Sequence, residues 1–201
     1  MKTRYFSIFL IALLISCIAQ AQNPVINGIP RDTTFTLHSA YIKASKQYSH
    51  IQKALSQFPH NVKAIENITY SKPNENRKLN LDIYRPKDKK KYPVLLMVHG
   101  GGWSSGSKSL QIPMAQQIAA KGYVTIPVEY RLSPEAAYPT AVEDLKTAIR
   151  WVRANAKKYA MDTSKIAISG CSAGGQLAML MGMTNFQSQY ELGDQRTKYN
   201  S

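Results

Sequence analysis

Three short apolar segments alternate with helical patterns along the second half of this chain. Val94–Val98, Tyr123–Val128 and Lys165–Ser169 have the length of strands, and their nearly continuous apolar side chains are typical of strands buried on both faces. Successive parallel strands need a long crossover connection, which a helix usually provides. The alternation therefore predicts an α/β fold with a mostly parallel, doubly wound sheet.

Helical patterns follow each of these segments. The first spans Pro113–Lys121, with a proline near its start and Gly122 as its stop. The second starts at a Thr-Ala-Val-Glu capping box at residues 140–143. The third runs from Ser172 to about Met183, with its methionines expected in the core. Upstream, two alternating segments, Glu66–Tyr70 and Leu79–Tyr84, predict an N-terminal antiparallel hairpin.

The N-terminal residues form separate regions. Residues 1–21 combine a basic start, an apolar run and Ala-Gln-Ala, which predicts a signal peptide and a soluble protein exported to the periplasm or the extracellular space. The run is too short for stable membrane insertion, but a lipobox-like stretch leaves lipoprotein anchoring through Cys17 open. Residues 22–60 form a polar leader with one helix expected near 41–58, and 61–201 carry the domain.

Composition narrows the possible partners. An apolar content of 44% with 19% charged residues is typical of a globular protein. The formal net charge is +14, but no motif typical of nucleic-acid recognition accompanies it, so we expect no nucleic-acid partner. Cleavage after residue 21 would leave Cys171 as the single cysteine, which excludes an internal disulfide.

Two glycine-rich segments follow predicted strands directly. Residues 170–174 read Gly-Cys-Ser-Ala-Gly, a G-x-S-x-G pentapeptide between a strand and a helix, where a sharp turn exposes Ser172 as a nucleophile. Residues 99–103 read His-Gly-Gly-Gly-Trp, and glycines let backbone N–H groups turn toward one point. Such donors stabilise the oxyanion of acyl transfer. Both segments lie at carboxyl ends of strands, where open α/β sheets bind ligands.

With these motifs the chain resembles the α/β-hydrolases of the esterase and lipase kind, close to hormone-sensitive-lipase-like carboxylesterases and bacterial feruloyl and acetyl esterases. The resemblance covers about residues 65–190 and includes Glu-Tyr-Arg-Leu-Ser-Pro-Glu at 129–135 and Tyr-Pro at 138–139 with Asp144 and Trp151. It implies Ser172 as nucleophile, and no metal or organic cofactor. The remaining implied roles are oxyanion-hole donors (Gly101, Gly102, Ala173) and residues that shape the motifs (His99, Gly100, Gly170, Gly174).

Several other residues in or near these motifs could be assigned catalytic roles. His99 could be taken as a general base, but the resemblance implies a structural role in the oxyanion loop. Glu129, Glu135 and Asp144 are candidate triad acids, with Asp144 expected to be structural. Cys171 is expected to be a packed neighbour of the serine rather than a reactive thiol.

A triad of this fold runs Ser, then Asp or Glu, then His, yet no histidine follows Ser172. Glu191 and Asp194 come too early. We therefore expect the triad acid and base outside this chain, which would be the N-terminal part of a longer hydrolase with its C-terminal strands missing.

The expected function is an exported serine carboxylic-ester hydrolase that forms an acyl-enzyme. Its substrates would be small-molecule or polysaccharide esters, such as acetyl or feruloyl decorations of plant polysaccharide. The alternatives are a non-catalytic or truncated protein of the same fold and a serine peptidase of that fold.

Overall fold

A five-stranded sheet forms the centre of the protein, in a computed structural model that describes residues 25–190 except 27, 55 and 186. The predicted signal peptide, Cys17, Glu191 and Asp194 lie outside the described residues. The strand order is β3-β4-β6-β5-β7. The strands are β3 (Val62–Asn74), β4 (Arg77–Pro86), β5 (Tyr92–Val98), β6 (Val124–Val128) and β7 (Met161–Gly170).

The pairing confirms both parts of the predicted sheet. β3 and β4 form the antiparallel hairpin, and β5 pairs in parallel with β6 on one side and β7 on the other. β4 joins β6 antiparallel, so the sheet is mixed and its parallel part is β6-β5-β7. Val94–Val98 pairs in unbroken register with Val124–Val128, which places the carboxyl ends of β5 and β6 at the same edge.

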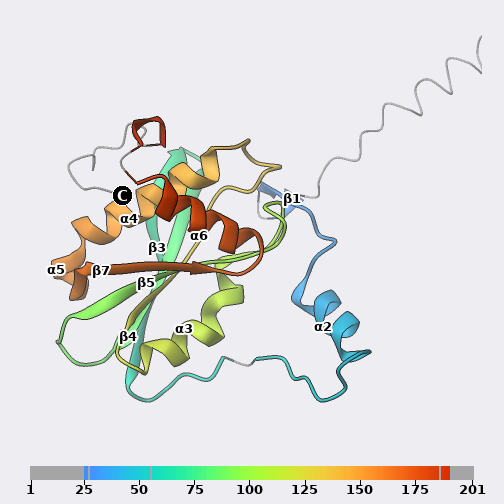
Figure 1. The fold of residues 1–201 in the computed structure, drawn as a ribbon, viewed down its shortest axis with the longest axis horizontal. Helices are drawn as coiled ribbons and strands as arrows, with labels where there is room; N and C mark the ends of the chain where they lie inside the picture. The colour runs from blue at the N-terminus through green and yellow to red at the C-terminus, as the bar shows by residue number, and fades with distance from the viewer. Residues whose placement is uncertain (1–24, 27, 55, 186, 191–201) are drawn as a thin grey trace, which may run out of the picture.

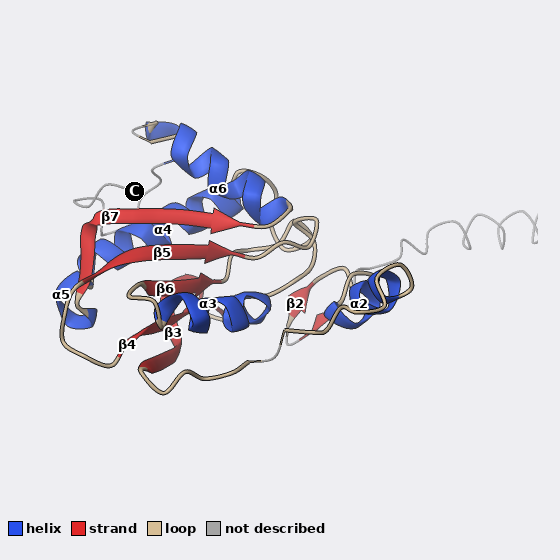
Figure 2. Cartoon of the chain, turned by 60° about the horizontal axis from the view of Figure 1, so that its bottom comes forward, coloured by secondary structure: helices blue, strands red, loops and turns tan. Residues whose placement is uncertain are grey.

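Helices cover both faces of the sheet, as the doubly wound prediction requires (Figure 2). On one face α4 (Thr140–Ala154) and α6 (Ala173–Met183) pack on the larger core, to which Leu145, Leu177 and Val98 belong. On the other face α3 (Ile112–Ala119) packs Ala115 and Ala119 against a smaller core. The short elements are η1 (Lys108–Gln111), α5 (Ala156–Tyr159) and η2 (Ser188–Tyr190).

Three local predictions were wrong. β7 is not buried on both faces, because it is the edge strand of the described sheet, and Ala167 is exposed. Of the α6 methionines expected in the core, Met181 is buried there, whereas Met179 and Met183 are 63% and 70% exposed. The capping box at Thr140 does not form; Pro139 is the N-cap of α4, and its carbonyl accepts the Val142 amide at 2.8 Å.

In the described part of the leader, two short strands and one helix precede the sheet in the sequence (Figure 1). The strands are β1 (Val25–Ile26) and β2 (Ile29–Pro30), and the helix is α2 (Leu37–Ser45). The helix begins earlier than predicted because Thr36 caps it, with the Ser39 side chain completing a capping box. It also ends earlier, and residues 46–54 and 56–60 form turns and loops. Within the described residues, no helix is both long and apolar enough to cross a membrane.

Candidate active site

Ser172 and the Gly100–Gly102 loop come together at one edge of the sheet. The loop follows β5 and Ser172 follows β7, and these parallel strands pair so that Val98 lies opposite Gly170. A Cβ built on Gly100 would lie 2.7 Å from the Cys171 carbonyl oxygen and 3.4 Å from the Ser172 Cβ. The two predicted motifs are therefore in van der Waals contact at the position where open sheets bind ligands.

The turn at Ser172 is strained. Ser172 has φ 54° and ψ −124°, a backbone conformation that side chains with a Cβ rarely adopt. It is the N-cap of α6, and the Gly174 amide donates to the Cys171 carbonyl at 3.0 Å. A sharp strand-to-helix turn of this kind holds a serine hydroxyl away from its own backbone, at the mouth of a cavity.

The two flanking glycines allow this turn to form. A Cβ on Gly170 would lie 2.3 Å from backbone atoms of Gly174, and a Cβ on Gly174 would lie 2.3 Å from the Val98 carbonyl oxygen. Both contacts are with backbone, which cannot rotate away as a side chain can. The first and last residues of the pentapeptide are therefore fixed as glycine by close packing, in agreement with their predicted structural role.

The glycine loop after β5 is held open by its own hydrogen bonds. Gly101 and Gly102 have φ values of 124° and 58°. The Gly101 carbonyl accepts hydrogen bonds from the Ser105 amide at 2.9 Å and the Ser105 hydroxyl at 2.7 Å. Within the described chain, the amides of Gly101, Gly102 and Ala173 donate to no protein acceptor. The loop and the start of α6 thus offer three unused N–H donors in one region.

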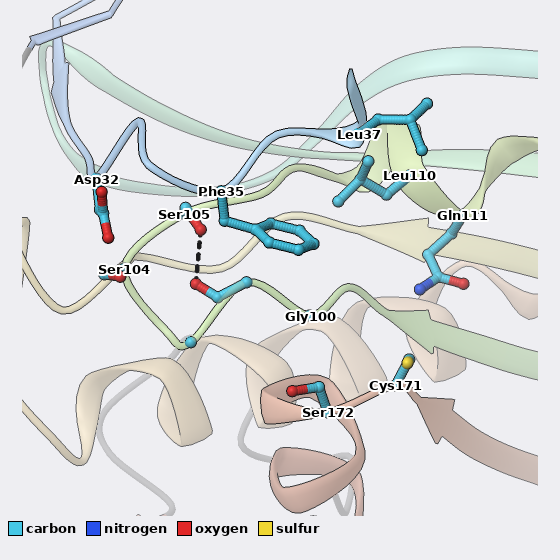
Figure 3. Close-up of a pocket in the computed structure, with 12 residues that line it drawn as sticks. Asp32, Phe35, Leu37, Gly100, Ser104, Ser105, Leu110, Gln111, Cys171 and Ser172 are labelled. Carbon is cyan, nitrogen blue, oxygen red and sulfur yellow. Dashed lines mark hydrogen bonds between the residues drawn. The ribbon is translucent and has the colours of Figure 1, made fainter. Parts of the chain in front are cut away.

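A cavity of about 520 Å³ lies beside these groups (Figure 3). This volume is in the usual range for small-molecule sites. Its walls come from the glycine loop, the serine turn, η1 and the leader. The lining residues are Asp32, Phe35, Leu37, Gly100, Gly101, Gly102, Ser104, Ser105, Leu110, Gln111, Cys171 and Ser172.

His99 lies beneath the loop rather than in the cavity. Its side chain is buried, stacks on the Tyr130 ring at 4.5 Å between centroids, and donates its Nδ1–H to the Gly100 carbonyl at 2.8 Å. Burial lowers the pKa of His99 to about 4. A buried, neutral imidazole already bonded to the loop is poorly placed as a general base, which favours the structural role.

The candidate triad acids form ion pairs elsewhere. Both oxygens of Asp144 accept hydrogen bonds from the Arg131 guanidinium, and Oδ2 also accepts the Arg131 amide at 2.9 Å. Hydrogen bonding to Asp144 raises the pKa of Arg131. Glu135 binds Arg77 at 2.6 Å, and Glu129 lies 3.8 Å from the same guanidinium. None of the three carboxylates lines the cavity, and the structural role predicted for Asp144 fits its contacts.

Other residues differ from expectation or were not foreseen. Cys171 is exposed and lines the cavity, so the prediction of a packed neighbour was wrong. A buried Lys108 donates to both oxygens of Asp82 at 2.8 and 2.7 Å, which anchors the segment after the glycine loop. Within the part of the chain that the structure describes, no group of three or more His, Cys, Asp or Glu residues could hold a metal ion.

The leader contribution to the cavity was also missed. Asp32, Phe35 and Leu37 line the cavity although they precede the glycine loop by more than 60 residues in the sequence. No motif marks these side chains, and the contact is long-range. Only the apolar character of Phe35 and Leu37 within a polar leader offered a signal.

Several known proteins to which this chain is similar are esterases. The chain is 43% identical to esterase LipC of Mycobacterium tuberculosis over 114 residues, which cover 55% of this chain and 28% of that protein. It is 34% identical to the esterase Est2 of Thermogutta terrifontis, with a TM-score of 0.53 over 60% of this chain and 44% of the other. A bifunctional GH43-CE protein of Bacteroides eggerthii is 37% identical, with a TM-score of 0.54 over 61% of this chain and 17% of the other.

These matches indicate the family of the chain, although the chain aligns with only part of the length of each relative. The chain spans less than a third of LipC and less than half of Est2. The mixed sheet with its parallel part β6-β5-β7 and the helices on its two faces agree with an α/β-hydrolase fold. The BD-FAE family model matches residues 81–201, more than half of the chain, and the chain belongs to the BD-FAE family of esterase-like α/β-hydrolases.

Proposed function

We propose that this chain carries the nucleophile and the oxyanion hole of a carboxylic-ester hydrolase. The observation that carries the proposal is the contact between two motifs: the strained Ser172 turn touches the Gly100–Gly102 loop, and both line one cavity. The esterase relatives support an ester as substrate.

In the proposed reaction, the Ser172 Oγ attacks the carbonyl carbon of the ester as a base removes its proton. The negative oxygen of the tetrahedral intermediate accepts hydrogen bonds from the amides of Gly101, Gly102 and Ala173, and each such donor is worth about 3–4 kcal/mol in other enzymes. The intermediate collapses, the base gives its proton to the departing alcohol, and an acyl-Ser172 ester remains. Water then attacks this ester by the same route and regenerates the hydroxyl. These steps use no metal and no organic cofactor.

The base must come from another part of the enzyme. An aliphatic hydroxyl is a weak nucleophile without an adjacent base. No described residue forms a hydrogen bond with the Ser172 hydroxyl, and His99 is buried and bonded to Gly100. We propose that the base and its acid partner belong to polypeptide not contained in these 201 residues. The low coverage of LipC and Est2 supports this assignment.

The substrate class and the location are further parts of the proposal. We propose export, on the basis of the signal-peptide pattern at residues 1–21. An exported esterase of this kind would act on acyl decorations of polysaccharide, and the similarity to the bifunctional GH43-CE protein motivates an acetylated polysaccharide as one test substrate.

The test uses the polypeptide encoded by the complete gene and its Ser172→Ala variant. We expect hydrolysis of p-nitrophenyl acetate with kcat/KM about 10⁴-fold lower or more in the variant, because removal of the nucleophile leaves only binding and the oxyanion hole. Ser71→Ala on β3, at the opposite edge of the sheet, is the matched control and should keep wild-type activity.

Two results would contradict the proposal. Undiminished activity in Ser172→Ala would place the chemistry elsewhere. Failure of the wild-type protein to hydrolyse any simple ester or acetylated xylan would favour the non-catalytic alternative, and cleavage of peptide substrates alone would favour the peptidase.

A further inference from the structure

The leader is hydrogen-bonded to the segment that follows the glycine loop. The Asp32 amide donates to the Ser104 carbonyl at 2.8 Å, and the Arg31 guanidinium donates to the Gly106 carbonyl at 3.4 Å. Asp32 in turn accepts the Thr34 amide at 2.8 Å, which fixes the turn that follows. The leader is therefore held beside the cavity by one backbone and one side-chain hydrogen bond to the segment that follows the glycine loop.

This attachment places apolar side chains opposite the serine. Phe35 and Leu37 line the same cavity as Ser172, together with Leu110 from η1 (Figure 3). Phe35 and Leu37 remain 47% and 55% exposed. These two large apolar side chains therefore leave apolar surface exposed at the cavity wall. A ligand that covers this surface would remove it from water, which is favourable.

The wall formed by Phe35 and Leu37 precedes the residues that the BD-FAE family model matches. The BD-FAE match begins at residue 81, whereas Phe35 and Leu37 belong to the leader. The proposed nucleophile and oxyanion loop thus lie within the matched residues, and one wall of their cavity comes from residues that precede the match.

We propose that Phe35 and Leu37 form a specificity-determining subsite that binds an apolar substituent of the ester. The inference rests on the proposed esterase function. An acetyl ester of a small alcohol offers little surface to this wall, whereas a longer aliphatic or an aromatic substituent buries the exposed faces of both side chains. Each buried methylene favours the longer ester by roughly fourfold. The substituent belongs either to the acyl group or to the alcohol, which share this apolar chemistry.

The experiment measures kcat/KM of the complete-gene protein along two ester series. The acyl series is p-nitrophenyl acetate, butyrate and hexanoate, and the alcohol series is ethyl, butyl and benzyl acetate. In Phe35→Ala we expect the preference for the longest member over the shortest to fall about tenfold in one series. Leu37→Ala should lower the same preference by a smaller factor. The affected series identifies which side of the ester contacts the wall.

Phe58→Ala provides a matched control, since Phe58 is also in the leader, is 51% exposed and does not line the cavity. Its preferences should equal those of the wild type, and Phe35→Leu should keep most of the preference. Each preference is a ratio of two kcat/KM values measured on the same variant, so a lower fraction of folded protein changes both values equally and leaves the ratio unchanged. Unchanged ratios in both series for Phe35→Ala would overturn the subsite and leave the esterase proposal standing. Absence of Ser172-dependent hydrolysis in the wild type would overturn both.

Discussion

His99 offers a quantitative test of the structural role assigned to it. Burial lowers the pKa of His99 to about 4 from the ordinary value of 6.5, so folding favours the neutral form of this side chain over the charged form. Between these two values the unfolded chain binds more protons than the folded protein. The contribution of neutral His99 to the free energy of unfolding is therefore fully present above pH 6.5 and is lost as the pH falls toward 4.

The size of this effect follows from the shift. A pKa unit corresponds to 1.36 kcal/mol, so the full loss below pH 4 is about 3 kcal/mol, and the loss between pH 7 and pH 5 is about 2 kcal/mol. Replacement by Asn keeps a side-chain N–H donor for the Gly100 carbonyl but removes the titrating ring and its stacking on Tyr130. His99→Asn should be less stable than the wild type at pH 7.

The assay is urea unfolding of the wild type and His99→Asn at pH 7, 6 and 5, with His38→Asn at an exposed position as a reference. The difference in the free energy of unfolding between the wild type and His99→Asn should narrow by about 2 kcal/mol from pH 7 to pH 5, because only the wild type has a buried ring that resists protonation. A constant difference across this range would refute the burial argument and reopen the role of His99 as a base.

Two further substitutions test the packing of the site. Gly174→Ala should unfold at clearly lower urea concentration than the wild type, because its Cβ would lie 2.3 Å from the Val98 carbonyl oxygen. In the control Gly182→Ala, in the same helix, the new Cβ meets no atom within 4 Å, and the substitution should be neutral or stabilising by up to about 1 kcal/mol. Equal stabilities of the two variants would contradict the close packing at Gly174. Asp144→Ala should cost about 3–5 kcal/mol in urea unfolding by leaving the Arg131 guanidinium without its partner, and a cost below 1 kcal/mol would show that this ion pair does not hold the segment in place.

Local patterns predicted most of the sheet and its two motifs. The continuous apolar runs identified β5 and β6, because strands covered on both faces need apolar side chains throughout. The glycine run and the pentapeptide identified the loop and the turn, since few other residues tolerate such backbone conformations. The contact between the two motifs followed from the parallel order of their strands.

Features that depend on distant partners were not predictable in the same way. The exposure of β7 and Met179 depends on which other elements pack against them, and their own sequence does not determine this. The helix start at Thr36 was missed because its capping box uses Ser39 in place of the usual Glu or Gln. The cavity wall at Phe35 arises from hydrogen bonds between the leader and the glycine loop, and such long-range contacts leave no periodic signal.

Covalent labelling is a direct test of the proposal that Ser172 is the nucleophile. The complete-gene protein would be treated with a fluorophosphonate, which reacts with activated serines, and the adduct mapped by tandem mass spectrometry. We expect one adduct on the peptide that contains Ser172, with loss of esterase activity in proportion to labelling and no adduct in Ser172→Ala. An adduct on another residue that abolishes activity, with Ser172 unmodified, would contradict it.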